Sequence, residues 1–158
     1  MTIVGLISPG EMGASIGAAA GPNVDRVVWA GDERGTTSHE RAGSTGLVDC
    51  RTLENMAQQS DIILSICPPH AADSVVSRIS TLGFSGVFVD CNAISPEKTC
   101  QLSSSFKPGQ YVDGGIVGGP AWEKESGTRL YLSGTGADAI AELFRESPLL
   151  TSVISDEV

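Results

Sequence analysis

The chain has 158 residues, about the length of one domain. It is 41% hydrophobic and 18% charged, which provides material for a buried core and excludes an intrinsically disordered chain. The net charge of −9 argues against nucleic acid or an anionic membrane as the main partner. No apolar run approaches the roughly 20 residues of a membrane helix, and the N-terminus lacks the basic segment of a signal peptide. We therefore expect a cytoplasmic protein.

The four cysteines, at positions 50, 67, 91 and 100, form no C-x-x-C pair, and only two histidines accompany them. This pattern favours reduced thiols over disulfides or a zinc site, so we expect no metal. We expect the cysteines to act as small core residues.

The first elements predict a βαβ unit. Residues 2–7 are an apolar, β-branched run, broken at Ser8-Pro9-Gly10 and followed by small and apolar residues to position 20. This pattern is typical of a strand, a tight turn and a helix. Gly21-Pro22-Asn23 ends the helix, and residues 24–30 predict the second strand.

The alternation continues along the chain. We expect further strands at residues 46–49, 62–67, 87–90, 111–117, 129–133 and 152–155, and helices at residues 37–42, 53–59, 71–82, 96–102 and 137–144. The 62–67 run is almost continuously apolar, as in a strand covered on both faces. The pattern predicts an α/β fold of the Rossmann type, a doubly wound, mostly parallel sheet with helices on both faces. No linker is evident, so residues 1–158 read as one domain.

The first βα turn resembles a phosphate-binding loop. A dinucleotide fold has G-x-G-x-x-G here, so that backbone and helix N-terminus can approach a pyrophosphate. In this chain Ser8, Gly10 and Gly13 take the three glycine positions. We expect Pro9 to hold Ser8 in an extended conformation, Gly10 to permit the close approach and Gly13 to permit tight helix packing.

The end of the second predicted strand leaves the choice of cofactor open. Asp32 lies 19 residues beyond Gly13, close to the spacing of the acidic residue that binds the ribose 2′-hydroxyl of NAD. Arg34 and Thr36 follow, and an arginine at this turn pairs with the 2′-phosphate of NADP. We weigh Arg34 above Asp32 and expect NADPH to bind more tightly than NADH.

Four segments together resemble the N-terminal domain of the β-hydroxyacid dehydrogenases, the group that contains 6-phosphogluconate dehydrogenase, 3-hydroxyisobutyrate dehydrogenase and, more distantly, the imine reductases. They are Val-Gly-Leu-Ile-Ser-Pro-Gly-Glu-Met-Gly at 4–13, Ser-Ile-Cys-Pro-Pro-His at 65–70, Val-Asp-Cys-Asn-Ala-Ile-Ser-Pro at 89–96 and Val-Asp-Gly-Gly-Ile-Val-Gly-Gly-Pro at 112–120. The match covers almost the whole chain in the family's order. The resemblance implies a nicotinamide cofactor, NADP or NAD, and a small-molecule substrate.

The resemblance also implies roles for individual residues. The pyrophosphate would be held by Ser8, Pro9, Gly10, Glu11, Met12 and Gly13, the adenosine end by Arg34 and Thr36, and the rest of the dinucleotide by Cys67, Pro68 and Pro69. Asn92 and Ala93 replace the family's Ser-Thr pair near the nicotinamide ribose, where Asn92 can still bond a hydroxyl. In the substrate segment Val117 replaces a serine that contacts the substrate carboxylate, which leaves the N–H groups of Gly118 and Gly119 to hold an anion.

Family members continue into an all-helical domain that carries the catalytic lysine and most of the dimer interface. The lysines of this chain, Lys98, Lys107 and Lys124, match no catalytic motif. We therefore expect the cofactor domain of a longer enzyme, which binds cofactor but is inactive alone and dimerises only with that second domain. A non-catalytic dinucleotide-binding module is the alternative. An S-adenosylmethionine methyltransferase shares the Gly-rich turn, but the later motifs count against it.

Other side chains have simpler interpretations. We expect Trp29 to pack within its strand, His39 to lie on a solvated helix face and His70 to lie in a loop near the cofactor. Trp122 borders the substrate cleft or packs locally, and the sequence does not decide between the two. Glu11 lies close to the expected phosphate site, so we expect it to point to solvent.

Overall fold

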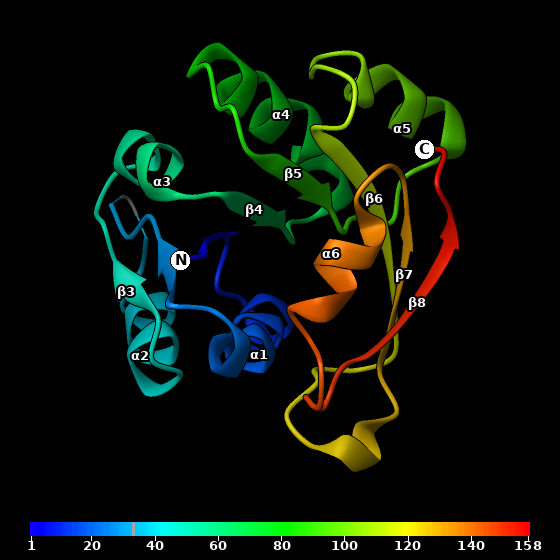
Figure 1. Ribbon diagram of the computed structural model, residues 1–158. Coiled ribbons are helices and arrows are strands. Elements are labelled where there is room, and N and C mark those ends of the chain that lie inside the picture. The colour runs from blue at the N-terminus through cyan, green and yellow to red at the C-terminus, as the bar shows by residue number, and fades with distance from the viewer. Residues whose placement is uncertain (33) are drawn as a thin grey trace.

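The computed structural model describes residues 1–32 and 34–158, and its strands form one sheet in the order β3-β2-β1-β4-β5-β6-β7-β8 (Figure 1). The strands are β1 (Ile3–Ile7), β2 (Arg26–Trp29), β3 (Val48–Asp49), β4 (Ile62–Ser65), β5 (Val87–Asp90), β6 (Tyr111–Val117), β7 (Arg129–Ser133) and β8 (Leu150–Ser155). The α-helices are α1 (Glu11–Ala20), α2 (Thr36–Ser44), α3 (Leu53–Gln59), α4 (Ala72–Thr81), α5 (Pro96–Ser103) and α6 (Ala137–Glu142). Short 3₁₀ turns are η1 (Gly21–Asn23), η2 (Pro69–Ala71) and η3 (Lys124–Ser126).

The first six strands are parallel, which confirms the predicted doubly wound α/β sheet. β7 runs antiparallel to β6, and β8 pairs with β7 in parallel. The chain crosses from β3 at one edge to β4 beside β1, so the strand order reverses between β1 and β4. In open α/β sheets ligands bind beyond the carboxyl ends of the strands at such a switch point.

Helices cover the sheet on both sides (Figure 1). On one face α1, α2 and α6 enclose a core that includes Leu6, Ile16 and Leu130. On the other face α3, α4 and α5 enclose a second core that includes Ile63 and Phe88. Because alternate residues of the central strands supply the two cores, these strands read as continuous apolar runs in the sequence.

The sequence located most elements to within one or two residues. Residues 53–59, 87–90, 111–117 and 129–133 match exactly. The second strand starts later than predicted, at Arg26, because the backbone is still in η1 at Asn23 and joins the ladder only after Asp25. The run at 62–67 leaves the sheet after Ser65, ahead of Pro68 and Pro69.

The single-residue expectations have mixed outcomes. Trp29 is buried in the core, as predicted. All four cysteines are free. Cys91 is buried and Cys50 and Cys67 are half-buried, but Cys100 is exposed on α5, so the prediction of a core position is wrong for Cys100.

Among the described residues, no helix is long and apolar enough to span a membrane.

Candidate dinucleotide site

The turn between β1 and α1 differs from the prediction at Ser8. Its φ of 65° lies in the left-handed region, so the expected extended conformation is wrong. The chain reverses direction between the end of β1 and the start of α1, and the N–H of Gly10 donates to the Ser8 carbonyl at 2.8 Å across Pro9. Ser8 thus adopts the conformation for which a glycine is ordinarily selected at this position.

Gly13 and Gly10 have different surroundings: Gly13 is tightly packed, as expected, and the space beside Gly10 is open. A Cβ on Gly13 would lie 2.3 Å from the backbone oxygen of Ser8, so only glycine lets α1 pack this closely on the turn. A Cβ on Gly10 would meet nothing within 4 Å, which means that this side of the turn is open. Gly10 is also the N-cap of α1, and no side chain among the described residues caps the first turn. The free N–H groups of that turn are therefore available to an anion.

An arginine from α2 braces the same turn. Arg41 pairs with the Glu11 carboxylate at 2.7 Å, and its Nη1 donates to the Pro9 carbonyl at 3.3 Å. The Glu11 side chain is 63% exposed, in agreement with the expectation that it points to solvent, and the contact with Arg41 also holds it in place. Arg41 thereby also keeps a cation beside the expected phosphate position.

The carboxyl ends of β2 and β3 are tied together. Asp49 Oδ1 accepts hydrogen bonds from the backbone N–H of Gly31 at 3.0 Å and of Arg51 at 2.7 Å. The N–H of Asp32 donates to the Arg51 carbonyl at 2.9 Å. Arg51 has a φ of 71°, a left-handed conformation that is uncommon for a non-glycine residue. The two strand ends thus form one rigid edge next to the phosphate turn.

Beside this edge lies a hollow of about 470 Å³, which we call the arginine basin. Its lining residues are Ala30, Asp32, Arg34, Arg51, Thr52, Leu53, Glu54 and Arg78. A narrower crevice of about 50 Å³ shares Arg34 and Arg78 with the basin and reaches Ser8. The predicted adenosine residue Arg34 therefore lies between the phosphate turn and the basin. Arg51 and Arg78 were missed by the sequence analysis.

Asn92 joins the ends of β4 and β5. Its Oδ1 accepts the N–H of Cys67 at 2.7 Å, and its Nδ2 donates to Asp90 Oδ1 and, at 3.3 Å, to Ser65 Oγ. The side chain is buried and its polar atoms already have protein partners. Its role in the structure is to position the Cys67-Pro68-Pro69 segment, and contact with a ribose stays a prediction. Ala93, next to it, is exposed.

Two carboxyl groups lie side by side beneath this edge, because Asp90 and Asp113 are register partners in β5 and β6. Burial raises the pKa of Asp90, although hydrogen bonds from Asn92 and from Tyr111 Oη at 3.1 Å oppose the rise. Burial and the neighbouring Asp90 charge raise the pKa of Asp113. Burial also raises the pKa of the Cys67 thiol, which disfavours a reactive thiolate.

The segment matched to the substrate site lies at the same end of the sheet. β6 pairs with β5 as far as Asp113 and then continues to Val117, which is 61% exposed. Gly118 has a φ of 126° and lies against Thr128, whose Oγ1 donates to the Gly119 carbonyl at 2.7 Å. This turn is therefore held in one conformation.

A buried serine connects the substrate segment with the phosphate turn. The N–H of Ala121 donates to Ser15 Oγ at 2.9 Å, and Ser15 Oγ donates to the Met12 carbonyl at 2.8 Å. A serine among alanines inside a predicted helix was the only sequence signal for this contact. It fixes the position of two predicted binding segments relative to each other.

The remaining residues border this region. Trp122 is 42% exposed and lines a shallow hollow with Glu11 and Arg41 rather than packing in the core. His70 lies exposed in η2, next to Pro69, as predicted. His39 is exposed on α2, but its ring packs edge-on against Trp29 and contacts the Gly31 carbonyl at 3.1 Å, so it helps to hold the β2 end.

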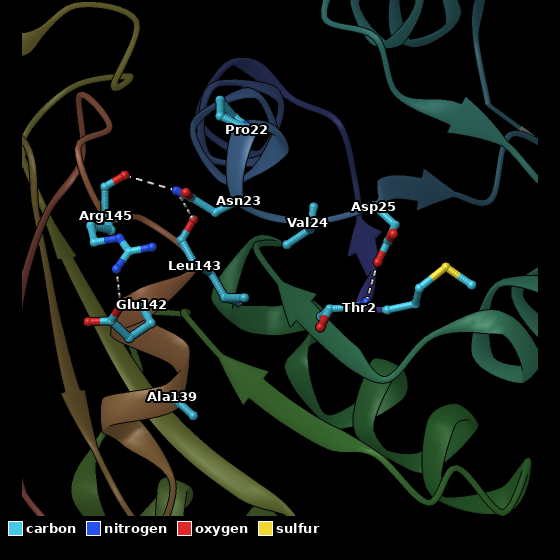
Figure 2. A pocket seen from close by; sticks show the side chains of 10 residues that line it. Thr2, Pro22, Asn23, Val24, Asp25, Ala139, Glu142, Leu143 and Arg145 are labelled. Atoms are coloured by element: carbon cyan, nitrogen blue, oxygen red, sulfur yellow. Dashed lines mark hydrogen bonds and ion pairs between the residues drawn. The ribbon is translucent and has the colours of Figure 1, made fainter.

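A larger hollow of about 720 Å³, which we call the amino-edge hollow, lies at the opposite end of the strands, beside the amino ends of β1 and β2 (Figure 2). Its polar side chains bond to one another and to the backbone. Asn23 Nδ2 donates to the carbonyls of Leu143 at 3.0 Å and Arg145 at 2.9 Å, and Asp25 accepts the N–H of Thr2. Arg145 pairs with Glu142 at 3.5 Å. These contacts join α6 to the first strands.

The comparisons with known proteins identify the fold. No family model and no curated protein sequence matches the chain. A conserved protein of unknown function, whose structure resembles 3-hydroxyacid dehydrogenases, matches with a TM-score of 0.83 and 26% identity over 98% of this chain and 58% of its own. An imine reductase from Bacillus cereus matches with a TM-score of 0.79 and 16% identity, over 99% of this chain and 56% of its own.

A 3-hydroxyisobutyrate dehydrogenase from Mycobacterium tuberculosis matches with a TM-score of 0.76 and 14% identity, over 99% of this chain and 56% of its own. Two further neighbours were solved with cofactor, an imine reductase variant from Myxococcus stipitatus with NAD+ and a reductive aminase from Aspergillus terreus with NADPH. The chain spans slightly more than half the length of these structures. In fold, the chain is similar to the corresponding part of these 3-hydroxyacid dehydrogenase-like and imine reductase structures.

Proposed function

We propose that the chain is the cofactor domain of an NAD(P)-dependent oxidoreductase that moves hydride between nicotinamide and a hydroxyacid-like or imine substrate. The observation that carries this proposal is the turn at the switch point. There the Gly10 side is open, no side chain caps the first turn of α1 within the described residues, and Gly13 packs against Ser8. This combination fits a pyrophosphate, because backbone donors and the helix dipole meet its charge.

The residues around the turn give each part of a dinucleotide a separate place. The first turn of α1 binds the pyrophosphate, and the ends of β2 and β3 bind the adenosine. Cys67, Pro68 and Pro69 border the other half, on a backbone that Asn92 holds in position. The cofactor supplies the hydride chemistry, and the protein supplies position and charge.

The substrate would lie between the nicotinamide and the end of β6. Val117 has no hydroxyl to offer a carboxylate, so we assign anion binding to the N–H groups of Gly118 and Gly119. Hydride transfer to or from a hydroxyl-bearing carbon also needs a proton-transfer group, which contributes roughly 10²–10⁴-fold to the rate. We propose that this group comes from the part of the neighbours' length that this chain does not span.

The experiment that tests cofactor binding is the Gly10→Val substitution. A valine side chain there meets no protein atom within 4 Å of its Cβ, so the variant should fold. It would occupy the space of the pyrophosphate and weaken both NADPH and NADH at least tenfold, about 1.4 kcal/mol or more. Gly43→Val, on the open side of α2, is the matched control, because its Cβ also meets nothing within 4 Å.

Isothermal titration calorimetry measures the affinities of the unaltered chain, Gly10→Val and Gly43→Val for NADPH, NADH and S-adenosylmethionine. Unchanged affinity in Gly10→Val, or binding of S-adenosylmethionine in place of the dinucleotides, contradicts the proposal. A non-catalytic module is the second candidate function. Assays of the 158-residue chain with hydroxyacids and cyclic imines should show binding without turnover, and the same assay on a chain with the neighbours' full length distinguishes the two candidates.

A further inference from the structure

Several arginines of this acidic chain gather around one hollow. The whole sequence has 10 lysines and arginines against 19 acidic residues, yet three of its arginines line the arginine basin. Resting on the cofactor domain proposed above, we infer that Arg51 and Arg78 join Arg34 in binding the 2′-phosphate of NADPH. They are then specificity-determining residues contributed by the turn after β3 and by α4, outside the turn after β2 from which the sequence predicts this contact.

The backbone around Arg51 is built to present its side chain. Asp49 accepts its N–H, and its carbonyl accepts the N–H of Asp32, so both backbone groups of Arg51 are used. These bonds hold a left-handed φ of 71° in a residue that has no glycine-like freedom. Strained backbone of this kind is concentrated at binding sites. The strain directs the chain from β3 toward the basin.

The three guanidinium groups are available to a ligand. Across residues 1–32 and 34–158, neither an ion pair nor a side-chain hydrogen bond engages Arg34, Arg51 or Arg78, whereas Arg41 and Arg145 have carboxylate partners. Asp32 and Glu54 also line the basin; like the three arginines they are exposed, and the arginines outnumber them. An anion is therefore the ligand that this lining favours.

A phosphate monoester fits the basin better than a ribose hydroxyl does. Guanidinium groups bind phosphate through paired, charge-assisted hydrogen bonds, and a hydroxyl would leave the excess positive charge of the lining without a counter-charge. The basin also adjoins the crevice that leads to Ser8, so an adenosine whose pyrophosphate lies on α1 has its ribose next to the basin. These observations favour the 2′-phosphate over an unrelated anion.

The test measures the dissociation constants of NADPH and NADH for the unaltered chain, Arg51→Ala, Arg78→Ala and Arg145→Ala. Arg145 is exposed at the opposite edge and is the matched control. We expect each basin substitution to weaken NADPH at least about fivefold and NADH less than about twofold, since one charge-assisted bond is lost only with the phosphate. Arg51→Lys should restore part of the loss, and Arg145→Ala should change neither constant.

The outcome of these titrations distinguishes failure of the arginine inference from failure of the proposed cofactor domain. If Arg51→Ala and Arg78→Ala weaken NADPH and NADH equally, or change neither, the arginines do not read the 2′-phosphate and this inference is wrong. If NADH binds with Gly10 dependence and NADPH binds no better, the cofactor domain stands and the inference fails. If neither dinucleotide binds, both proposals fail.

Discussion

Two hollows lie at opposite edges of the same sheet, and the larger one is the less suited to bind a ligand. The amino-edge hollow measures about 720 Å³ and the arginine basin about 470 Å³. In the first, Asn23, Asp25 and Arg145 have partners within the protein (Figure 2). In the basin, three guanidinium groups have none among the described residues. A hollow whose hydrogen-bond donors have no protein partner is better suited to bind a ligand than a larger hollow whose polar side chains hold two elements together.

The topology produces this difference. Carboxyl ends of parallel strands lie at one edge, where the chain turns into helices whose free N–H groups face outward. At the amino edge, helix ends return to the sheet, and side chains such as Asn23 satisfy the carbonyls of Leu143 and Arg145, which follow α6. Substitutions at the two ends of the strands should therefore have different effects on ligand binding.

The largest effect should come from Gly13→Ala. Its Cβ would lie 2.3 Å from the Ser8 oxygen, a backbone atom that cannot move without shifting the turn. We expect a loss of about 3 kcal/mol in the free energy of unfolding, in the range known for overpacking, together with loss of dinucleotide binding. Urea titration and calorimetry measure the two effects, and an alanine variant with full stability and affinity would refute the assigned role of the turn.

Asn23→Ala should lower the stability of the protein without changing its affinity for dinucleotides. The substitution leaves the carbonyls of Leu143 and Arg145 without their donor, and at about 1 kcal/mol for each hydrogen bond we expect roughly 2 kcal/mol of lost stability. The dissociation constants of NADPH and NADH should stay the same. A change in affinity with unaltered stability would mean that the amino-edge hollow is the binding site.

Asp113→Asn should alter the pH dependence of stability. The pKa of Asp113 is raised in the folded protein, so its stabilising contribution is complete below the ordinary aspartate pKa of about 3.9 and is lost as the pH rises through the folded value. Relative to the unaltered chain, the variant should therefore gain stability between about pH 4 and pH 7. We expect less than about 1 kcal/mol, because the carboxyl is only half-buried and solvent screens it.

Urea midpoints of both proteins across that range provide the measurement. A stability difference that is constant with pH, or one in which the variant loses stability relative to the unaltered chain toward neutral pH, would contradict the raised pKa.

The smallest effect should come from Glu11→Gln. Removing a carboxylate from the first turn of α1 reduces repulsion of the pyrophosphate, and Arg41 keeps its bond to the Pro9 carbonyl. We expect both dinucleotides to bind about twofold more tightly, since charges near a helix N-terminus contribute about 0.3–1 kcal/mol. Weaker binding of both would show instead that the Glu11–Arg41 pair is needed to hold the turn.

The sequence predicted the parts of the site that follow one another along the chain. The turn at Gly10 and Gly13, the strand ends and the turn after Val117 are formed where the sequence predicts them, because strand periodicity and turn residues are local signals. It failed at Ser8, where the reversal into α1 overrode the preference that Pro9 imposes.

The sequence also missed the contacts between distant segments. Arg51 follows a two-residue strand and Arg78 lies within α4, so neither belongs to a recognisable motif. Only the sheet order and the helix packing bring them to Arg34. Asn92 was assigned to the cofactor because its local motif is suggestive, whereas its partners Cys67 and Ser65 come from another strand.

Backbone amide NMR during titration with NADPH compares the two edges in one measurement. We predict that the amides of residues 9–13 with a backbone N–H, together with those of Asp32, Arg34 and Arg51, shift or broaden as NADPH is added. The amides of Asn23, Asp25, Glu142 and Arg145 should stay unchanged. Shifts confined to the amino edge, or no shifts at millimolar NADPH, would contradict the assignment of the carboxyl edge as the dinucleotide site.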